Sequence, residues 1–86
     1  MAHSGDGGPA RRAHFNLPSS IAFDRADIYV ADSANNVIRR VHEGIVTTVK
    51  TTNLSYPRDI AIDATRHLYI NDSFHHRVLR MALPPT

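Results

Sequence analysis

The sequence has 86 residues, with ten basic and eight acidic side chains, a net charge of +2 when histidine is neutral, and no cysteine. A chain of this length allows at most one small domain, and the lack of cysteine excludes disulfides and thiolate metal sites. Hydrophobic residues at 42% and charged residues at 21% are typical of a folded domain. Small domains usually need further stabilisation, here from a histidine or carboxylate metal site or from association with other chains.

The basic residues are spread along the chain, with no run longer than Arg11-Arg12 or Arg39-Arg40. The sequence therefore does not favour a dedicated nucleic-acid binder, which normally concentrates positive charge on one face. No apolar run approaches the about 20 residues of a membrane-spanning helix. The first six residues lack the basic and apolar regions of a cleavable signal, so a chain expressed as written is expected in the cytoplasm.

The strongest internal signal is a repeat, because residues 18–41 align with residues 57–81. The offset is 39 residues at first and 40 after one extra residue near Arg66. The identical pairs include Pro18 and Pro57, Ile21 and Ile60, Ala22 and Ala61, Asp24 and Asp63, Tyr29 and Tyr69, Asp32 and Asp72, Ser33 and Ser73, and Arg40 and Arg80. Most mismatched apolar positions keep their character, so one supersecondary unit occurs twice.

Each copy divides into short strands joined by turns. In the first copy, β-forming residues predict strands at 20–24, 27–31, 37–41 and 45–49. The Asp and Asn residues of segment 32–36 predict a turn. In the first of these strands, large Ile21 and Phe23 alternate with small Ala22, which predicts burial on both faces. The second copy ends after its third strand, residues 77–81.

A four-stranded meander repeating at about 40 residues is typical of a propeller blade. We therefore expect an all-β fold of two β-propeller blades, one a four-stranded antiparallel meander and one three-stranded. Residues 1–14 are expected to form an inter-blade linker, residues 15–52 the first blade and residues 53–86 the second. Two blades alone would leave apolar faces exposed to water. Burial of each Val, Ile or Phe side chain on such a face would stabilise the fold by roughly 1.5–3 kcal/mol. Closed cyclic association removes both open faces.

Several segments carry a resemblance to a known family. They are GDGGPA at 5–10, FNLP at 15–18, IYVADSANNVIR at 28–39, YPRDIAID at 56–63 and LYINDS at 68–73. Together they resemble the NHL repeat of bacterial proteins. Rings of this family are commonly six-bladed, which implies a homotrimer of this chain, while a tetramer with eight blades stays open. The first hairpin turns lack the glycine common in the family, and His75-His76 replaces Asn35-Asn36.

The candidate binding residues lie in the turns and beside the inner strands. They are Arg58, Ser19, Asn35, Asn36, His75 and His76. Three copies of Arg58 are expected to form a basic ring at the mouth of a central channel. Arg40 and Arg80 are expected to bridge neighbouring strands.

No catalytic residue is assigned, and neither a metal nor a cofactor is predicted. The glycines at 5–8 lack the lysine and helix of a P-loop. Asp32 and Asp72 are expected to form Asx-type turns. His75 and His76 would point to opposite sides of an extended chain, so they could not chelate one ion together.

The leading hypothesis is a non-catalytic oligomeric β-propeller scaffold, or a binding module for a peptide, a protein or a small anionic ligand. A propeller fragment with assembly as its only function is also open. One alternative is a metal-dependent lyase or hydrolase with histidines gathered at the ring axis, as the family resemblance suggests. Another is RNA binding on a basic face. The expected partner is the chain itself, since the homotrimer is favoured.

Overall fold

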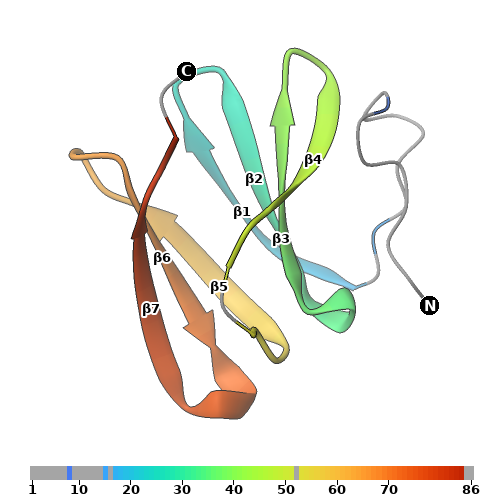
Figure 1. Cartoon of the computed structure of the whole chain (residues 1–86), viewed down its shortest axis with the longest axis vertical. Coiled ribbons are helices and arrows are strands. Elements are labelled where there is room, and N and C mark those ends of the chain that lie inside the picture. The colour runs from blue at the N-terminus through green and yellow to red at the C-terminus, as the bar shows by residue number, and fades with distance from the viewer. Residues whose placement is uncertain (1–7, 9–14, 16, 52, 85–86) are drawn as a thin grey trace.

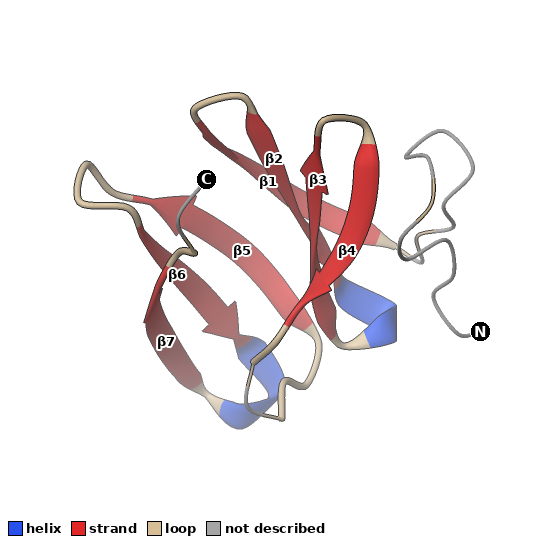
Figure 2. Ribbon diagram, turned by 45° about the horizontal axis from the view of Figure 1, so that its top comes forward, coloured by secondary structure: helices blue, strands red, loops and turns tan. Residues whose placement is uncertain are grey.

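The computed structural model describes residues 8, 15, 17–51 and 53–84, and these form two antiparallel sheets (Figures 1 and 2). The first sheet has the order β1-β2-β3-β4 and the second the order β5-β6-β7. The strands are β1 (Pro18–Asp24), β2 (Asp27–Asp32), β3 (Val37–His42), β4 (Ile45–Val49), β5 (Pro57–Ile62), β6 (His67–Asp72) and β7 (Arg77–Ala82). Two 3₁₀ turns, η2 (Ser33–Asn35) and η3 (Ser73–His75), join β2 to β3 and β6 to β7. The expected all-β fold, with a four-stranded and a three-stranded antiparallel sheet, is confirmed.

Strand register confirms the sequence repeat and locates its one insertion. Phe23 pairs with Ile28 in the first sheet, and Ile62 pairs with Leu68 in the second. The chain therefore turns through residues 24–27 in one sheet and 63–67 in the other, one residue longer. β1 begins two residues earlier than expected, at Pro18, a position that tolerates proline because it is the first of the strand.

The backbone enters the left-handed region at matching places in the two repeats. Leu17 and Tyr56 have φ of 53° and 52°, and Asn36 and His76 have φ of 61° and 53°. Asparagine tolerates this conformation better than most residues, whereas other side chains are strained by roughly 1–2 kcal/mol. The two repeats thus share unusual backbone geometry as well as sequence.

The hydrophobic core lies between the two sheets, with β1 and β5 side by side. The first sheet contributes Ala22, Tyr29, Ala31, Ile38 and Val49, and the second contributes Ile60, Ile62, Leu68, Ile70, Leu79 and Met81; Leu54 and Leu83 complete the cluster. The first sheet contributes small Ala22 and Ala31 together with large Tyr29 and Ile38, and the second sheet contributes large aliphatic residues. Side chains of different size on facing sheets can interlock closely.

The expectation that the first strand is buried on both faces is wrong for the single chain. Ile21 and Phe23 on β1 are 58% and 62% exposed. Their repeat counterparts on β5, Ile60 and Ile62, belong to the core or pack against it. The difference arises because each sheet has two faces, and the described part of one chain supplies a neighbouring sheet for only one of them.

The expected linker at residues 1–14 lies outside the described residues, apart from Gly8. The carbonyl of Gly8 accepts a hydrogen bond from the N–H of Val46 at 3.0 Å. Within the described ranges, no helix is long and apolar enough to cross a membrane.

Candidate functional site

The six candidate binding residues lie at one end of the two sheets, here called the turn end. At this end β1 and β5 begin and the turns η2 and η3 lie, because Pro18 pairs with Asp32 and Pro57 with Asp72 (Figure 2). The residues in question are Ser19, Asn35, Asn36, Arg58, His75 and His76. Sequence reasoning grouped them as turn and inner-strand residues, and the register explains why they share one end.

Ser19 holds the two sheets together at this end. Its Oγ donates to the carbonyl of Arg58 at 2.5 Å and lies 2.5 Å from the Oγ of Ser33. The Ser33 hydroxyl in turn donates to the carbonyl of Pro57 at 2.5 Å. Ser33 is fully buried. These hydroxyls satisfy backbone carbonyls of the neighbouring sheet, so the bonds of Ser19 serve the packing of the two sheets.

Asn36 and Asn35 also make bonds within the fold. The Oδ1 of Asn36 accepts a hydrogen bond from the N–H of Tyr56 across the sheet boundary at 2.8 Å. The Nδ2 of Asn35 donates to the Oδ2 of Asp32 at 3.0 Å. The Nη1 of Arg39 lies 3.6 Å from the same carboxylate oxygen, and the side chains of Arg39 and Asp32 are fully buried. The bonds of both asparagines fix local structure.

His75 contacts a buried carboxylate in the second sheet. Asp72 accepts hydrogen bonds from the N–H of Ser55 at 2.6 Å, from the Nε of Arg77 at 2.7 Å and from the Nδ1 of His75 at 2.7 Å. Burial raises the pKa of Asp72, but these donors outweigh it and lower the pKa to about 2. His75 corresponds to Asn35 of the first repeat. Both side chains donate a hydrogen bond to the aspartate that precedes the turn.

The expected Asx-type turns are wrong at these positions. Asp32 and Asp72 precede 3₁₀ turns, but neither carboxylate caps its turn in the manner of an Asx turn. The carboxylates bind the side chains described above. His75 lies within η3 and His76 follows it in the left-handed region, so the pair is not extended.

Arg58 and His76 are the candidates whose side chains are exposed and make no hydrogen bond or ion pair with the described residues. The β5 register shifts between Pro57 and Ile60, as the β1 register does between Pro18 and Ser20. Such bulges redirect side chains and are common beside binding sites. Arg58 and the adjacent exposed Asp59 lie in this irregular segment.

Sequence reasoning missed a cluster of charges at the opposite end, the hairpin end. Arg66 of the second sheet binds the buried Asp24 of the first sheet, with Nη2 at 2.6 Å and Nε at 3.0 Å from Oδ2. These bonds lower the pKa of Asp24 and outweigh the opposing effect of burial. The two residues are 42 positions apart, and no local sequence pattern predicts their contact.

A second carboxylate at the hairpin end is bound within the first sheet. Burial raises the pKa of Asp27, but hydrogen bonds from His42 and Arg40 bring it below its usual value. The Nη2 of Arg40 lies 2.6 Å from Asp27 and the Nδ1 of His42 lies 2.7 Å from it. The expectation that Arg40 bridges neighbouring strands is confirmed, because Asp27 is on β2.

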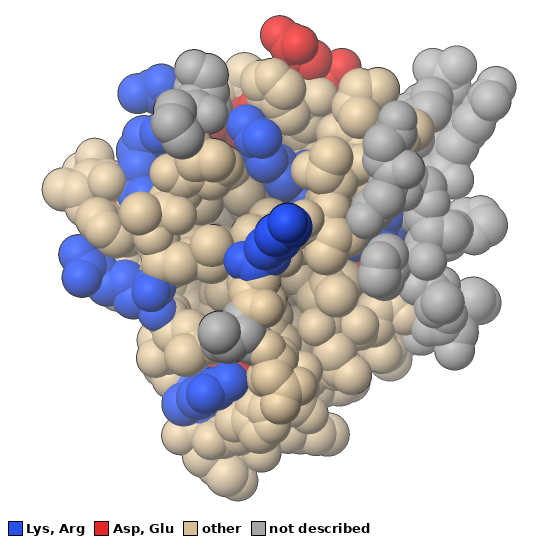
Figure 3. All heavy atoms as spheres, viewed as in Figure 1, with Lys and Arg blue, Asp and Glu red and all other residues tan. Residues whose placement is uncertain are grey.

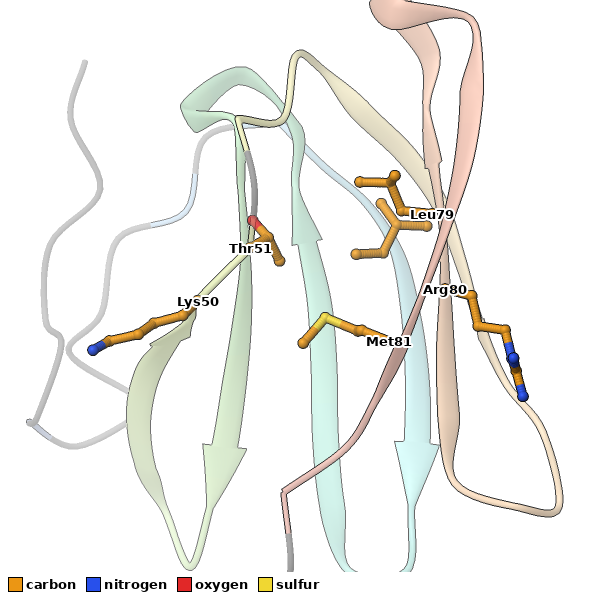
Figure 4. A pocket seen from close by; sticks show the side chains of 6 residues that line it. Lys50, Thr51, Leu79, Arg80 and Met81 are labelled. Carbon is orange, nitrogen blue, oxygen red and sulfur yellow. The ribbon is translucent and has the colours of Figure 1, made fainter.

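A groove runs between β4 of the first sheet and β7 of the second. Two adjoining cavities of about 370 and 350 Å³ form it and share Lys50 and Met81. Figure 4 shows Thr51, Leu79 and Met81 directed into the space between the strands. Lys50 and Arg80 point outward on its two sides. The middle of the groove is therefore apolar and its margins are basic.

No group of three or more His, Cys, Asp or Glu side chains among the described residues is arranged to hold a metal ion. On the face shown in Figure 3, the basic side chains form separate groups.

No protein-family model and no curated protein sequence matches this chain.

Proposed function

We propose that this chain is a self-assembling binding scaffold, two blades of a β-propeller of the NHL type that closes head to tail as a homotrimer. The observation that carries the proposal is the contrast between equivalent residues. Ile60 and Ile62 of the second repeat pack against the first sheet, whereas Ile21 and Phe23 of the first repeat are exposed.

The two outer faces of the chain are counterparts of the two faces that pack inside it. The outer face of the first sheet carries Ile21 and Phe23, which match the packed Ile60 and Ile62. The outer face of the second sheet carries Ala61, Tyr69 and Val78, which match the packed Ala22, Tyr29 and Ile38. A second copy can therefore dock in the geometry that the chain already uses between its own sheets.

The energetics favour such docking. Ile21, Phe23 and Val78 are 58%, 62% and 67% exposed. Covering each would stabilise the assembly by roughly 1–2 kcal/mol, given about 1.5–3 kcal/mol for complete burial. The interface is heterologous, so repeated rotation gives a ring, and three two-blade chains make the six blades common in the family.

The expected ligand site is the turn end near the ring axis. β1 and β5 lie side by side and are the inner strands of such a ring, so three Arg58 guanidinium groups would surround the axis. A small anion or an acidic peptide is the ligand class that such a ring of charge selects.

The experiment measures mass by native mass spectrometry for the intact chain and two single-face variants. Phe23→Glu blocks the outer face of the first sheet, and Val78→Glu blocks that of the second. We expect the unaltered chain at three times its monomer mass of 9.6 kDa, each variant as a monomer, and their equimolar mixture as a one-to-one dimer. Only a head-to-tail interface restores association in the mixture.

Phe74→Glu is the matched control, because Phe74 is 65% exposed but stacks on Tyr56 at the turn end. This variant should remain trimeric. A monomeric unaltered chain, or variants whose mixture does not associate, would overturn the proposal.

A further inference from the structure

The outer edge of β7 is an unpaired strand edge within the described part of the chain. β7 pairs with β6 on one side, and no described strand pairs with it on the other. Alternate residues along such an edge present free backbone N–H and C=O groups, which bind extended segments. The groove between β4 and β7 runs beside this edge and gives a bound segment an apolar surface to cover.

The first sheet shows how such a segment would be held. There β4 covers the corresponding edge of β3, with Arg39 opposite Thr48, Arg40 opposite Thr47 and Val41 opposite Val46. The matching residues of β7 are Leu79, Arg80 and Met81. A strand added to β7 in the β4 position would lie opposite these three residues.

The side chains of β7 define the chemistry of the added strand. Leu79 and Met81 pair with Ile70 and Leu68, so they share the face of the sheet core. Arg80 pairs with Tyr69 and lies on the other face. The added strand would therefore extend an interface that already exists, with aliphatic residues beside Leu79 and Met81 and an acidic residue beside Arg80.

We propose that the β7 edge and this groove bind an extended segment of another protein as an antiparallel strand, with the pattern aliphatic–acidic–aliphatic. Backbone pairing supplies affinity and the alternating side chains supply selectivity, as in other cases of strand addition. The groove lies between the two sheets of one chain, but Arg80 shares the outer face of the second sheet with Tyr69 and Val78, so the effect of Arg80→Glu on ring closure is measured separately by native mass spectrometry.

The test uses the full chain and the capped, fluorescently labelled peptide GIVEVVK, which places its glutamate opposite Arg80 in the β4 register. Fluorescence anisotropy measures affinity. We expect saturable binding that Arg80→Glu weakens about fivefold, from loss of a cross-strand ion pair and gain of repulsion. The peptide GIVKVVK should show the reverse preference and bind the Arg80→Glu variant more tightly than the unaltered chain.

The controls separate strand addition from general charge attraction and from misfolding. Arg25→Glu makes the same charge change at an exposed position of the turn between β1 and β2 and should leave the affinity for GIVEVVK within twofold. The peptide GIVEPVK, whose proline removes a backbone donor, should bind at least tenfold more weakly. NMR shift changes on binding should centre on residues 77–82 and 49–51.

The inference is overturned by the absence of saturable binding, by equal effects of Arg25→Glu and Arg80→Glu, or by shift changes centred elsewhere. Rescue of the Arg80→Glu variant by the lysine peptide shows that the variant is folded. Native mass spectra of the same samples report assembly separately, so failure of the ring and failure of the groove are distinguishable.

Discussion

Arg66 of the second sheet donates two hydrogen bonds to the buried carboxylate of Asp24 in the first sheet, because its Nη2 and Nε both lie within 3.0 Å of Oδ2. Arg66 lies in the segment that is one residue longer than its counterpart in the first repeat. The Nη2 of Arg66 also donates to the carbonyl of Pro84 at 2.7 Å. One side chain from the insertion thus joins both sheets and the segment after β7.

Asp24→Asn should destabilise the chain by about 1–2 kcal/mol. The change removes charge-assisted hydrogen bonds from Arg66 and leaves a poorer acceptor in a buried place. Urea denaturation followed by circular dichroism measures the free energy of unfolding. Asp59→Asn, the same change at an exposed position, should stay within about 0.5 kcal/mol; equal losses in both variants would contradict this role for Asp24.

Stability should fall in acid as Asp72 becomes protonated. The folded-state pKa of Asp72 is about 2, below the unfolded value of about 3.9. Its contribution is therefore complete above about pH 4 and is lost as pH falls toward 2. Since water screens the half-exposed His75 and Arg77, we expect the contribution to be about 1–2 kcal/mol.

The same measurement on Asp72→Asn isolates this group. The variant should be less stable at neutral pH, and its difference from the unaltered chain should shrink between pH 4 and pH 2. A difference that stays constant across this range would show that the Asp72 charge does not stabilise the fold.

Asn36→Ala should cost about 1–2 kcal/mol, because it removes two separate features. The amide side chain accepts the N–H of Tyr56, and asparagine tolerates the φ of 61°. Asn36→Gly keeps the backbone freedom and loses only the acceptor, so it should cost less than the alanine variant. Chemical denaturation of the two variants compares their free energies of unfolding. A larger loss for the glycine variant than for the alanine variant would exclude backbone strain as a contributor to the loss in the alanine variant.

The anion-binding expectation for Arg58 can be tested with inorganic pyrophosphate. Isothermal titration of the intact chain at low salt should show binding that weakens as salt rises, and Arg58→Ala should weaken it at least tenfold. Lys50→Ala removes the same charge from the groove and should leave the affinity nearly unchanged. Equal effects of both variants would indicate general attraction, and no binding at low salt would contradict the expectation.

The fold was more predictable from the sequence than the contacts at its ends. The repeat predicts seven strands and the place of the insertion, because strand alternation and turn residues are local signals. The contact of Asp24 with Arg66 depends on how the two sheets stack, and sequence spacing does not report this. The turn residues were found for the same local reasons, but the partners of Ser19 and Asn36 lie on the other sheet.

The exposure of Ile21 and Phe23 could not be read from their strand. Alternating large and small apolar residues predict two covered faces, which is a statement about an assembled set of sheets. The described part of one chain covers one of these two faces. The apolar pattern of β1 therefore predicted a second neighbouring sheet that the described residues do not contain.

The matched left-handed residues have a consequence for how stability grows with length. Leu17 and Tyr56, like Asn36 and His76, sit at the same backbone positions of successive units, so every added unit brings a fixed conformational penalty together with a fixed gain from stacking. The free energy of an array then increases linearly with the number of units, as in a one-dimensional chain of coupled elements. Replacing Leu17 and Tyr56 by glycine would lower the penalty once per unit, and a small gain would multiply along the array.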